Sequence, residues 1–223
     1  MKTSTKAMLA VTGGLLLAAA IATAVTVAQI RESIPEALMD PTTKLLVASA
    51  PDSHRLTSPE ASTVTFVEFL DFECESCGAA YPYIEDLRAE FGSEVTFVMR
   101  YFPLPGHVNS TNAAVAVEAA SRQGMLIPMY QRLFEKQAEW GEQGTSKADV
   151  FREYAAQLGL DLAQYDTDVA DPSTLARVEA DFAAGLALGV QSTPSIFINN
   201  VPLNLRSFDD LRNGIVDALD AQG

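Results

Sequence analysis

The sequence predicts an α/β domain in which one β-sheet is interrupted by a block of helices, and an N-terminal transmembrane helix precedes it. A strand–helix–strand pattern occupies residues 63–101, and strand character returns only at 195–203. Residues from about 109 to 188 look helical almost throughout. An uncharged apolar run stands before all of these. The order is therefore β-α-β, a helical insertion, then β-β-α.

Composition excludes several function classes. The chain has 15 Lys and Arg against 29 Asp and Glu, a net charge of −14, which argues against nucleic acid or an anionic membrane surface as a partner. There are two cysteines, three positions apart. So short a loop constrains the unfolded chain little, and such a pair is usually redox-active or half of a metal site. No cofactor is expected.

The amino terminus carries a membrane segment. Residues 7–30 hold no charge, and as a helix they would span roughly 36 Å, enough to cross a hydrocarbon core of about 30 Å. Lys2 and Lys6 make the leading flank basic, so the remainder should be exported. A cleaved signal peptide is the alternative, because small residues at 22–24 and 26–28 suit a peptidase. The length of the run favours a retained anchor, and either way the cysteines meet an oxidising compartment.

Three segments follow from this pattern. Residues 1–30 form the anchor or uncleaved signal, and residues 31–53, with three prolines among small and polar residues, form a linker. Residues 54–223 form the folded domain. The linker is too short for a dimerisation domain, so the chain is expected to be a monomer.

The first half of the domain is a β-α-β unit. Thr63–Leu70 is β-branched and aromatic on both faces, which predicts a buried central strand. The helix after Cys77 has an apolar face and contains Pro82, which should bend it. Val95–Tyr101 is the second strand, and a right-handed crossover should make the two strands parallel.

The second half closes the sheet after helices that break near Gly124, at 140–144, at Gly159 and at 171–172. Ser195–Ile198 is a strand, and Asn199 and Asn200 suit a two-residue turn because Asn tolerates positive φ. Val201–Leu203 should pair back as an edge strand, since it contains Pro202. A last helix begins near Ser207 with Asp210 three residues on, a capping-box-like start.

Cys74 and Cys77 lie where the buried strand ends and a helix begins. Unpaired backbone N–H groups and the helix dipole should stabilise an anion there, which lowers the pKa of Cys74 below the free value of about 8.5. Cys77, one helical turn on, should be shielded and act as the resolving thiol. The alternatives are an inert disulfide and a zinc site. Zinc would need four ligands, and the two histidines, His54 and His107, each stand alone.

Glu68 interrupts the apolar strand six residues before Cys74. A buried carboxylate loses solvation and holds its proton to higher pH, so Glu68 could accept the proton of Cys77. The alternative is that its side chain reaches water at the strand's edge.

These motifs together resemble the thioredoxin superfamily and, within it, the DsbA-like branch. The resemblance covers roughly residues 53–223 and rests on Glu68, the Cys74–Cys77 pair, Pro82, Thr193-Pro194-Ser195 and the long helical insertion. It implies that Pro194 is cis and packs beside the cysteines, and that the Thr193 backbone is available to pair with a substrate strand. It also implies Glu68 as the buried proton acceptor.

The sequence departs from that branch between the cysteines. DsbA-type oxidases have Pro-His there, and this chain has Glu75-Ser76, with Glu73 on the other side of Cys74. Like charges disfavour a thiolate, so we expect the pKa of Cys74 to be above that of the DsbA oxidase and the pair to be less oxidising.

The function expected is a membrane-tethered, extracytoplasmic protein thiol–disulfide oxidoreductase. It would donate its Cys74–Cys77 disulfide to exported proteins, and a membrane redox partner would then reoxidise it. The alternatives are a reductase or isomerase on the same scaffold and a non-catalytic module that binds peptides. Secretion after signal cleavage is the alternative location.

Overall fold

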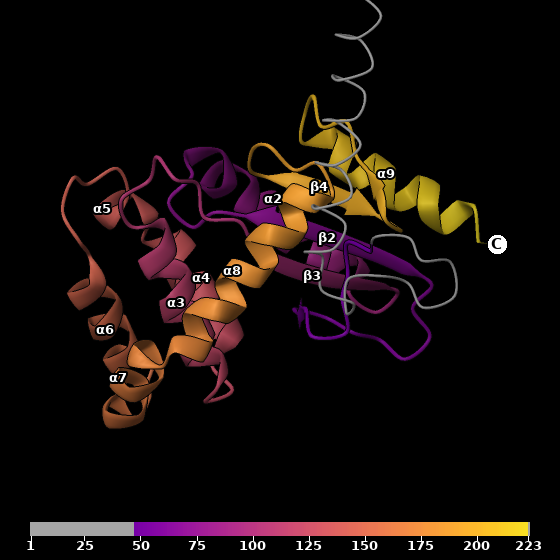
Figure 1. The fold of residues 1–223 in the computed structure, drawn as a ribbon. Helices are drawn as coiled ribbons and strands as arrows, with labels where there is room; N and C mark the ends of the chain where they lie inside the picture. The colour runs from indigo at the N-terminus through magenta and orange to yellow at the C-terminus, as the bar shows by residue number, and fades with distance from the viewer. Residues whose placement is uncertain (1–46, 223) are drawn as a thin grey trace, which may run out of the picture. The chain divides into compact units, whose positions relative to one another are not determined.

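Two seven-residue strands, β2 (Val64–Leu70) and β3 (Val95–Tyr101), form the centre of the sheet in this computed structural model, which describes residues 47–222 (Figure 1). Both are almost wholly buried, as their continuous apolar sequences predict. They are parallel, with Glu68 opposite Met99, and α2 (Glu75–Phe91) connects them. The predicted β-α-β unit is confirmed.

The sheet has the strand order β1-β3-β2-β4-β5. β4 (Ser195–Ile198) runs antiparallel to β2, and β5 (Val201–Pro202) pairs with β4 at the edge, as Pro202 predicts. Asn199 and Asn200 make the turn with φ of 50° and 67°, which confirms the predicted hairpin. At the other edge, β1 (His54–Arg55) pairs antiparallel with β3. β1 was not predicted, because two residues are too few for a periodic pattern.

Helices cover both faces of the sheet. On one face, α2 and the last helix, α9 (Asp209–Asp220), pack on alternate residues of the central strands, among them Phe66 and Leu70. On the other face, Val67 and Phe69 join a second apolar cluster, against which Phe182 of α8 (Pro172–Ala187) packs. Glu68 alternates with Val67 and Phe69, so it lies on the α2 face, the face toward Cys77.

The helical insertion lies between β3 and β4, where the sequence predicts it. Figure 1 shows its helices gathered beyond one end of the sheet, with α8 returning across the sheet. Gly124 and Gly159 follow α3 and α6 with φ of +73° and +81°, conformations that favour glycine. Asp171 caps α8, with Pro172 at its first position. The helices before α8 are α3 (Ser110–Ser121), α4 (Leu126–Glu135), α5 (Gln137–Trp140), α6 (Ala148–Gln157) and α7 (Leu162–Ala170).

The packed domain begins before residue 54, within the predicted linker. Ala48 and Ala50 are both fully buried. The Ala48 amide donates to Asn200 Oδ1 (2.9 Å), and its carbonyl accepts from Arg100 Nη1 (2.9 Å). Small side chains and satisfied backbone groups let this segment lie against the sheet, a fit that composition alone does not reveal.

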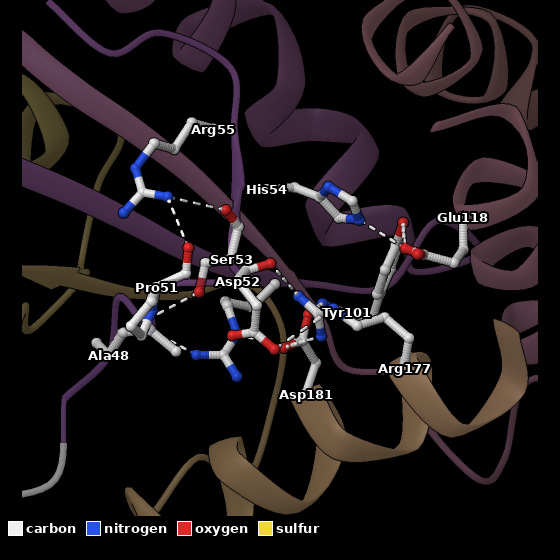
Figure 2. A network of polar contacts seen from close by, with 12 residues as sticks. Ala48, Pro51, Asp52, Ser53, His54, Arg55, Tyr101, Glu118, Arg177 and Asp181 are labelled. Carbon is white, nitrogen blue, oxygen red and sulfur yellow. Dashed lines mark hydrogen bonds and ion pairs between the residues drawn. The ribbon is translucent and has the colours of Figure 1, made fainter. Parts of the chain in front are cut away.

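Buried ions hold this segment and α8 to β3 (Figure 2). Asp181, fully buried, accepts from Arg100 Nε at 2.5 Å and from Arg177 Nη1 at 2.6 Å. Beside them, Glu118 of α3 contacts His54 Nε2 at 2.6 Å and accepts from the Tyr101 hydroxyl at 3.1 Å. Each of these buried charges therefore has a partner, as burial requires.

The predicted membrane anchor, residues 7–30, lies outside the described residues, as does most of the predicted linker. Within residues 47–222, no helix is both long enough and apolar enough to cross a membrane.

Candidate functional site

The cysteine pair lies just after β2, at the start of α2. Cys74 is the N-cap of α2 with extended backbone, and its carbonyl accepts from the Gly78 amide (3.0 Å). Cys74 is 8% exposed and Cys77 is fully buried, and both are thiols. The expected shielding of Cys77 is confirmed.

The pKa of Cys74 is lowered to about 5. The largest cause is the hydrogen bond with the Cys77 side chain, and burial opposes it. Hydrogen bonds with the Thr193 side chain and with the backbone N–H groups of Cys77 and Ser76 lower it further. These amides belong to the first turn of α2, so the helix start stabilises the thiolate as the sequence predicts.

The pKa of Cys77 is shifted in the opposite direction, well above its ordinary value. Burial is the main cause, and the hydrogen bond to Cys74 and the charge of Glu68 add to it. At neutral pH one thiol is therefore ionised while its neighbour keeps its proton. This is the division between an attacking or leaving sulfur and a resolving one.

Glu68 is 3% exposed and lies on the α2 face of the central strand. Burial raises its pKa to about 8, with the charges of Glu85 and Cys74 adding to the effect. The predicted rise is confirmed, and the alternative, a side chain in water at an edge, does not hold because β2 has neighbours on both sides. Its role as a proton acceptor stays a prediction.

The Thr193–Pro194 loop comes to the cysteines from the far end of the sequence. The Thr193–Pro194 peptide bond is cis, as the resemblance implies. The Cys74 thiol lies 3.5 Å from the Thr193 carbonyl oxygen, across 119 positions of sequence. The structure thus brings Cys77 and the Thr193–Pro194 loop to Cys74. Glu68 interacts with both thiols through its charge.

Asp71 holds the loops around the site, a function that sequence reasoning missed. Its buried carboxylate accepts from the amides of Glu73 (2.8 Å) and Leu104 (2.9 Å), from Ser110 Oγ (2.5 Å), and contacts His107 Nδ1 (2.6 Å). His107 therefore packs in the loop after β3, as expected. An Asp directly after a buried strand was the available signal, because it is a common turn-former.

The Glu73 carboxylate is hydrogen-bonded at the start of α3, a contact that the sequence did not predict. Glu73 is 2% exposed, and its carboxylate accepts from the Asn109 amide (2.5 Å) at the start of α3. A helix N-terminus partly compensates a negative charge. Of the two neighbouring carboxylates, Glu75 alone is exposed.

Two hollows lie on either side of the cysteine pair. One, of about 460 Å³, is lined by Ser76, Ala79, Pro194, Leu205, Arg206, Ser207 and Phe208. The other, of about 260 Å³, is lined by Glu73, Glu75, Gln137, Ala138, Gly141 and Glu142. In the part of the chain that the structure describes, no three His, Cys, Asp or Glu side chains group as metal ligands would.

A family model described as thioredoxin matches residues 49–217. Among solved structures, a thioredoxin-like oxidoreductase from Silicibacter pomeroyi is 25% identical, with a TM-score of 0.65 over 78% of this chain and 96% of that one. BdbD from Bacillus subtilis (24% identity, TM-score 0.64, 75% and 93% covered) and α-DsbA1 from Wolbachia pipientis (19%, 0.65, 78% and 96%) share the fold.

Curated relatives are much longer than the segment they share with this chain. A Na⁺/H⁺ antiporter NhaA from Herminiimonas arsenicoxydans is 36% identical over 148 residues, 66% of this chain and 22% of that protein. NhaA 1 from Mycolicibacterium vanbaalenii is 36% identical over 163 residues, 71% of this chain and 25% of that protein. The chain therefore spans about a quarter of the length of these relatives.

Proposed function

Because the chain belongs to the thioredoxin superfamily and, within it, to the DsbA-like thiol–disulfide oxidoreductases, we propose that it exchanges disulfides with proteins through Cys74 and Cys77. The observation that carries this proposal is the opposite shift of the two thiols. The pKa of Cys74 is lowered to about 5, and that of Cys77 is raised. In the reduced protein, the ionised Cys74 would attack a partner disulfide beside the cis Pro194 loop. In the oxidised protein, a partner thiolate would attack Cys74 at the same place.

In the proposed direction the protein is a dithiol oxidase. A substrate thiolate attacks Cys74 Sγ of the Cys74–Cys77 disulfide, and Cys77 leaves and takes up a proton, which Glu68 supplies. The second substrate thiolate attacks the substrate sulfur of the mixed disulfide, and Cys74 leaves as a thiolate. Two substrate thiols become one disulfide, and the two electrons end on the enzyme's cysteines.

The acidity of Cys74 supports this direction. A stabilised Cys74 thiolate stabilises the reduced enzyme, and a stable reduced form makes its disulfide a stronger oxidant. The hydrogen bond from the Asn109 amide at the start of α3 partly compensates the charge of Glu73, one of the two that would oppose the thiolate. A reductase or isomerase remains the second candidate, because Ser76 stands where familiar oxidases have a histidine and the exposed Glu75 adds a negative charge beside Cys74.

The proposed setting is extracytoplasmic, with residues 7–30 as a membrane anchor, exported proteins as substrates and a membrane partner that reoxidises the monomer. The uncharged run and the basic flank before it support this setting. The matched antiporters are named for ion exchange, but the chain spans about a quarter of them, so the proposal extends to thiol chemistry alone.

The reduction potential decides between oxidase and reductase. We expect a value nearer that of DsbA, about −120 mV, from equilibration of the purified protein with glutathione buffers. A value near that of thioredoxin, about −270 mV, would overturn the oxidase direction.

Trapping tests whether the cysteines react with proteins at all. In C77A, the resolving thiol is gone, so substrate proteins should accumulate on Cys74 as mixed disulfides that a reductant releases. The matched control is the double variant C74A/C77A, which should trap nothing. Equal amounts on both variants would favour a non-catalytic peptide-binding module.

A further inference from the structure

Gln137 of the helical insertion contacts the turn that carries Cys74. Its single amide nitrogen, Nε2, donates to the carbonyl oxygens of Phe72 (2.8 Å) and Cys74 (2.9 Å). These two carbonyls belong to the residues on either side of Glu73. Phe72 lies in the turn after β2, and Cys74 is the N-cap of α2. One side chain therefore ties both sides of the turn to a helix that begins 63 residues later.

Gly78 makes room for this side chain. A Cβ at position 78 would lie 2.0 Å from Gln137 Oε1, 2.8 Å from Cδ and 3.1 Å from Nε2. All three of its nearest atoms thus belong to Gln137. A glycine within a helix costs about 1 kcal/mol relative to alanine, so its presence in the first turn of α2 needs a reason. The approach of Gln137 supplies that reason.

The backbone of Gln137 is itself held in place. It begins the short helix α5, whose last residue, Trp140, is fully buried. The Trp140 indole donates to the Leu133 carbonyl (3.1 Å), and its ring meets Phe151 edge-on at 4.8 Å. The Gln137 carbonyl accepts from the Gly141 amide (2.7 Å). The insertion therefore presents the Gln137 amide from a rigid support.

We propose that Gln137 is a positioning residue for Cys74, and that Gly78 is required only because Gln137 occupies the space beside it. The inference rests on the proposed thiol chemistry. It adds that a side chain of the helical insertion affects the acidity of Cys74. The backbone N–H groups of Ser76 and Cys77 stabilise the thiolate only while the turn aims them at the sulfur. By holding the carbonyls of Phe72 and Cys74, which lie in the turn just before these N–H groups, Gln137 fixes that aim.

A double-mutant cycle on Gly78 and Gln137 tests the inference. The readout is the thiolate absorbance of Cys74 against pH in the reduced full-length protein, with folding checked by urea denaturation. Gln137→Ala should lower the ratio of thiolate to thiol at a given pH by about three- to tenfold, the worth of a lost hydrogen bond. Gly78→Ala should do the same, because its methyl displaces the amide.

Non-additivity is the decisive outcome. With Gln137 already truncated, the Cβ at position 78 meets no side chain of residue 137, so the double variant should match Gln137→Ala. This comparison stands even if Gly78→Ala alone does not fold. Additive effects, or an unchanged titration in Gln137→Ala, would overturn the inference. Gln157→Ala, an exposed glutamine on α6, is the matched control and should titrate as the unchanged protein does.

The titration also separates this inference from the proposed function. It needs no substrate, so the coupling between Gly78 and Gln137 can hold in a protein that exchanges no disulfide, and that result would overturn only the function. Active exchange with no coupling would overturn only the role of Gln137.

Discussion

Burial and hydrogen bonding give three side chains in and just after β2 very different pKa values. The pKa of Cys74 is about 5, that of Glu68 is about 8, and that of Cys77 is raised well above its ordinary value. The first has hydrogen-bond donors from a helix start, whereas burial is the largest cause of the other two shifts. At neutral pH, Glu68 and Cys77 therefore both keep their protons while Cys74 is ionised.

Removal of Cys77 should make Cys74 less acidic. The hydrogen bond from Cys77 is the largest cause of the lowered pKa of Cys74, so C77A should move it from about 5 toward the free value. Thiolate absorbance of the reduced protein against pH measures the shift. Ser76→Ala, which keeps both thiols and the backbone amides, is the control, and a shift of the same size there would contradict the assignment.

Glu68 should destabilise the fold as pH rises. Its pKa is about 8 in the folded protein against an ordinary 4.5, so between these values the folded state holds a proton that the unfolded state has lost. Stability therefore falls from about pH 4.5 to pH 8, by roughly 5 kcal/mol at most. Glu68→Gln should remove this fall, so its stability relative to the unchanged protein should be greater at pH 9 than at pH 5.

Urea denaturation at both pH values checks this prediction. Glu94→Gln, at an exposed acid before β3, is the control and should change stability equally little at each pH. A difference between Glu68→Gln and the unchanged protein that does not depend on pH would mean that Glu68 titrates normally.

Sequence reasoning found the residues that carry a chemical signature and missed those that act by tertiary contact. Cys74, Cys77 and Glu68 stand out because thiols and a lone acid in an apolar strand are unusual locally. Gln137 and Asp71 look ordinary in the sequence. Their roles depend on loops that meet only in the folded chain, as when Gln137 reaches the Phe72 carbonyl.

At the scale of elements, α8 is fixed to β3 by charge as well as by apolar packing. Asp181 of α8 is fully buried. Its carboxylate forms an ion pair with Arg100 of β3 and accepts a hydrogen bond from the Tyr101 amide (3.1 Å). Removing one partner of a buried pair leaves the other charge unpaired, which typically costs about 3–5 kcal/mol. The pair thereby ties the end of the insertion to the sheet.

Asp181→Ala should accordingly lower the free energy of unfolding by about 3–5 kcal/mol, measured by urea denaturation at neutral pH. The control is Asp166→Ala, which breaks the exposed pair with Arg152 and should cost less than about 1 kcal/mol. Similar losses in the two variants would show that the buried Arg100–Asp181 pair contributes no more to the free energy of unfolding than the exposed pair does.

Element boundaries were predicted well wherever a periodic pattern or a breaker marks them. Val95–Tyr101 and Ser195–Ile198 are strands over the predicted residues, and Asp171 and Pro172 begin α8 as expected. β1 was missed, because it pairs through two residues only and depends on the edge that β3 offers.

At the scale of the whole molecule, the first described residues, 47–55, belong to the fold through contacts with distant parts of the chain. His54 contacts Glu118 of α3 across 64 positions of sequence. Although burial alone would raise the pKa of Glu118, the hydrogen bond and charge of His54 leave it lowered. A carboxyl with a lowered pKa in the folded state adds stability above its ordinary pKa, and this is lost as pH falls through the folded value.

His54→Ala should therefore cost roughly 1–3 kcal/mol near pH 7, because Glu118 loses its partner. The deficit should shrink as pH falls through the folded pKa of Glu118. Denaturation curves at about pH 7 and about pH 4 measure it, with Arg55→Ala, at an exposed neighbour, as control. A deficit that grows toward low pH would contradict the pairing.

The molecule-wide architecture was predictable because its parts occur in an order that few folds share. A parallel pair, a helical block and a closing hairpin predict one sheet with a helical insertion, and the structure adds that β4 pairs with β2. The start of the domain was not predictable in this way, since Ala48 and Ala50 carry no pattern and owe their burial to partners such as Asn200 and Arg100.

The hydrogen bond from the Ala48 amide to Asn200 has a directional consequence. Asn200 lies at one end of β4, and Pro194 precedes the other end, so the polypeptide enters the domain away from the reactive sulfur. A fluorophore attached at Val47 should therefore report on the end of β4 that lies away from Pro194, and not on the chemistry at Cys74.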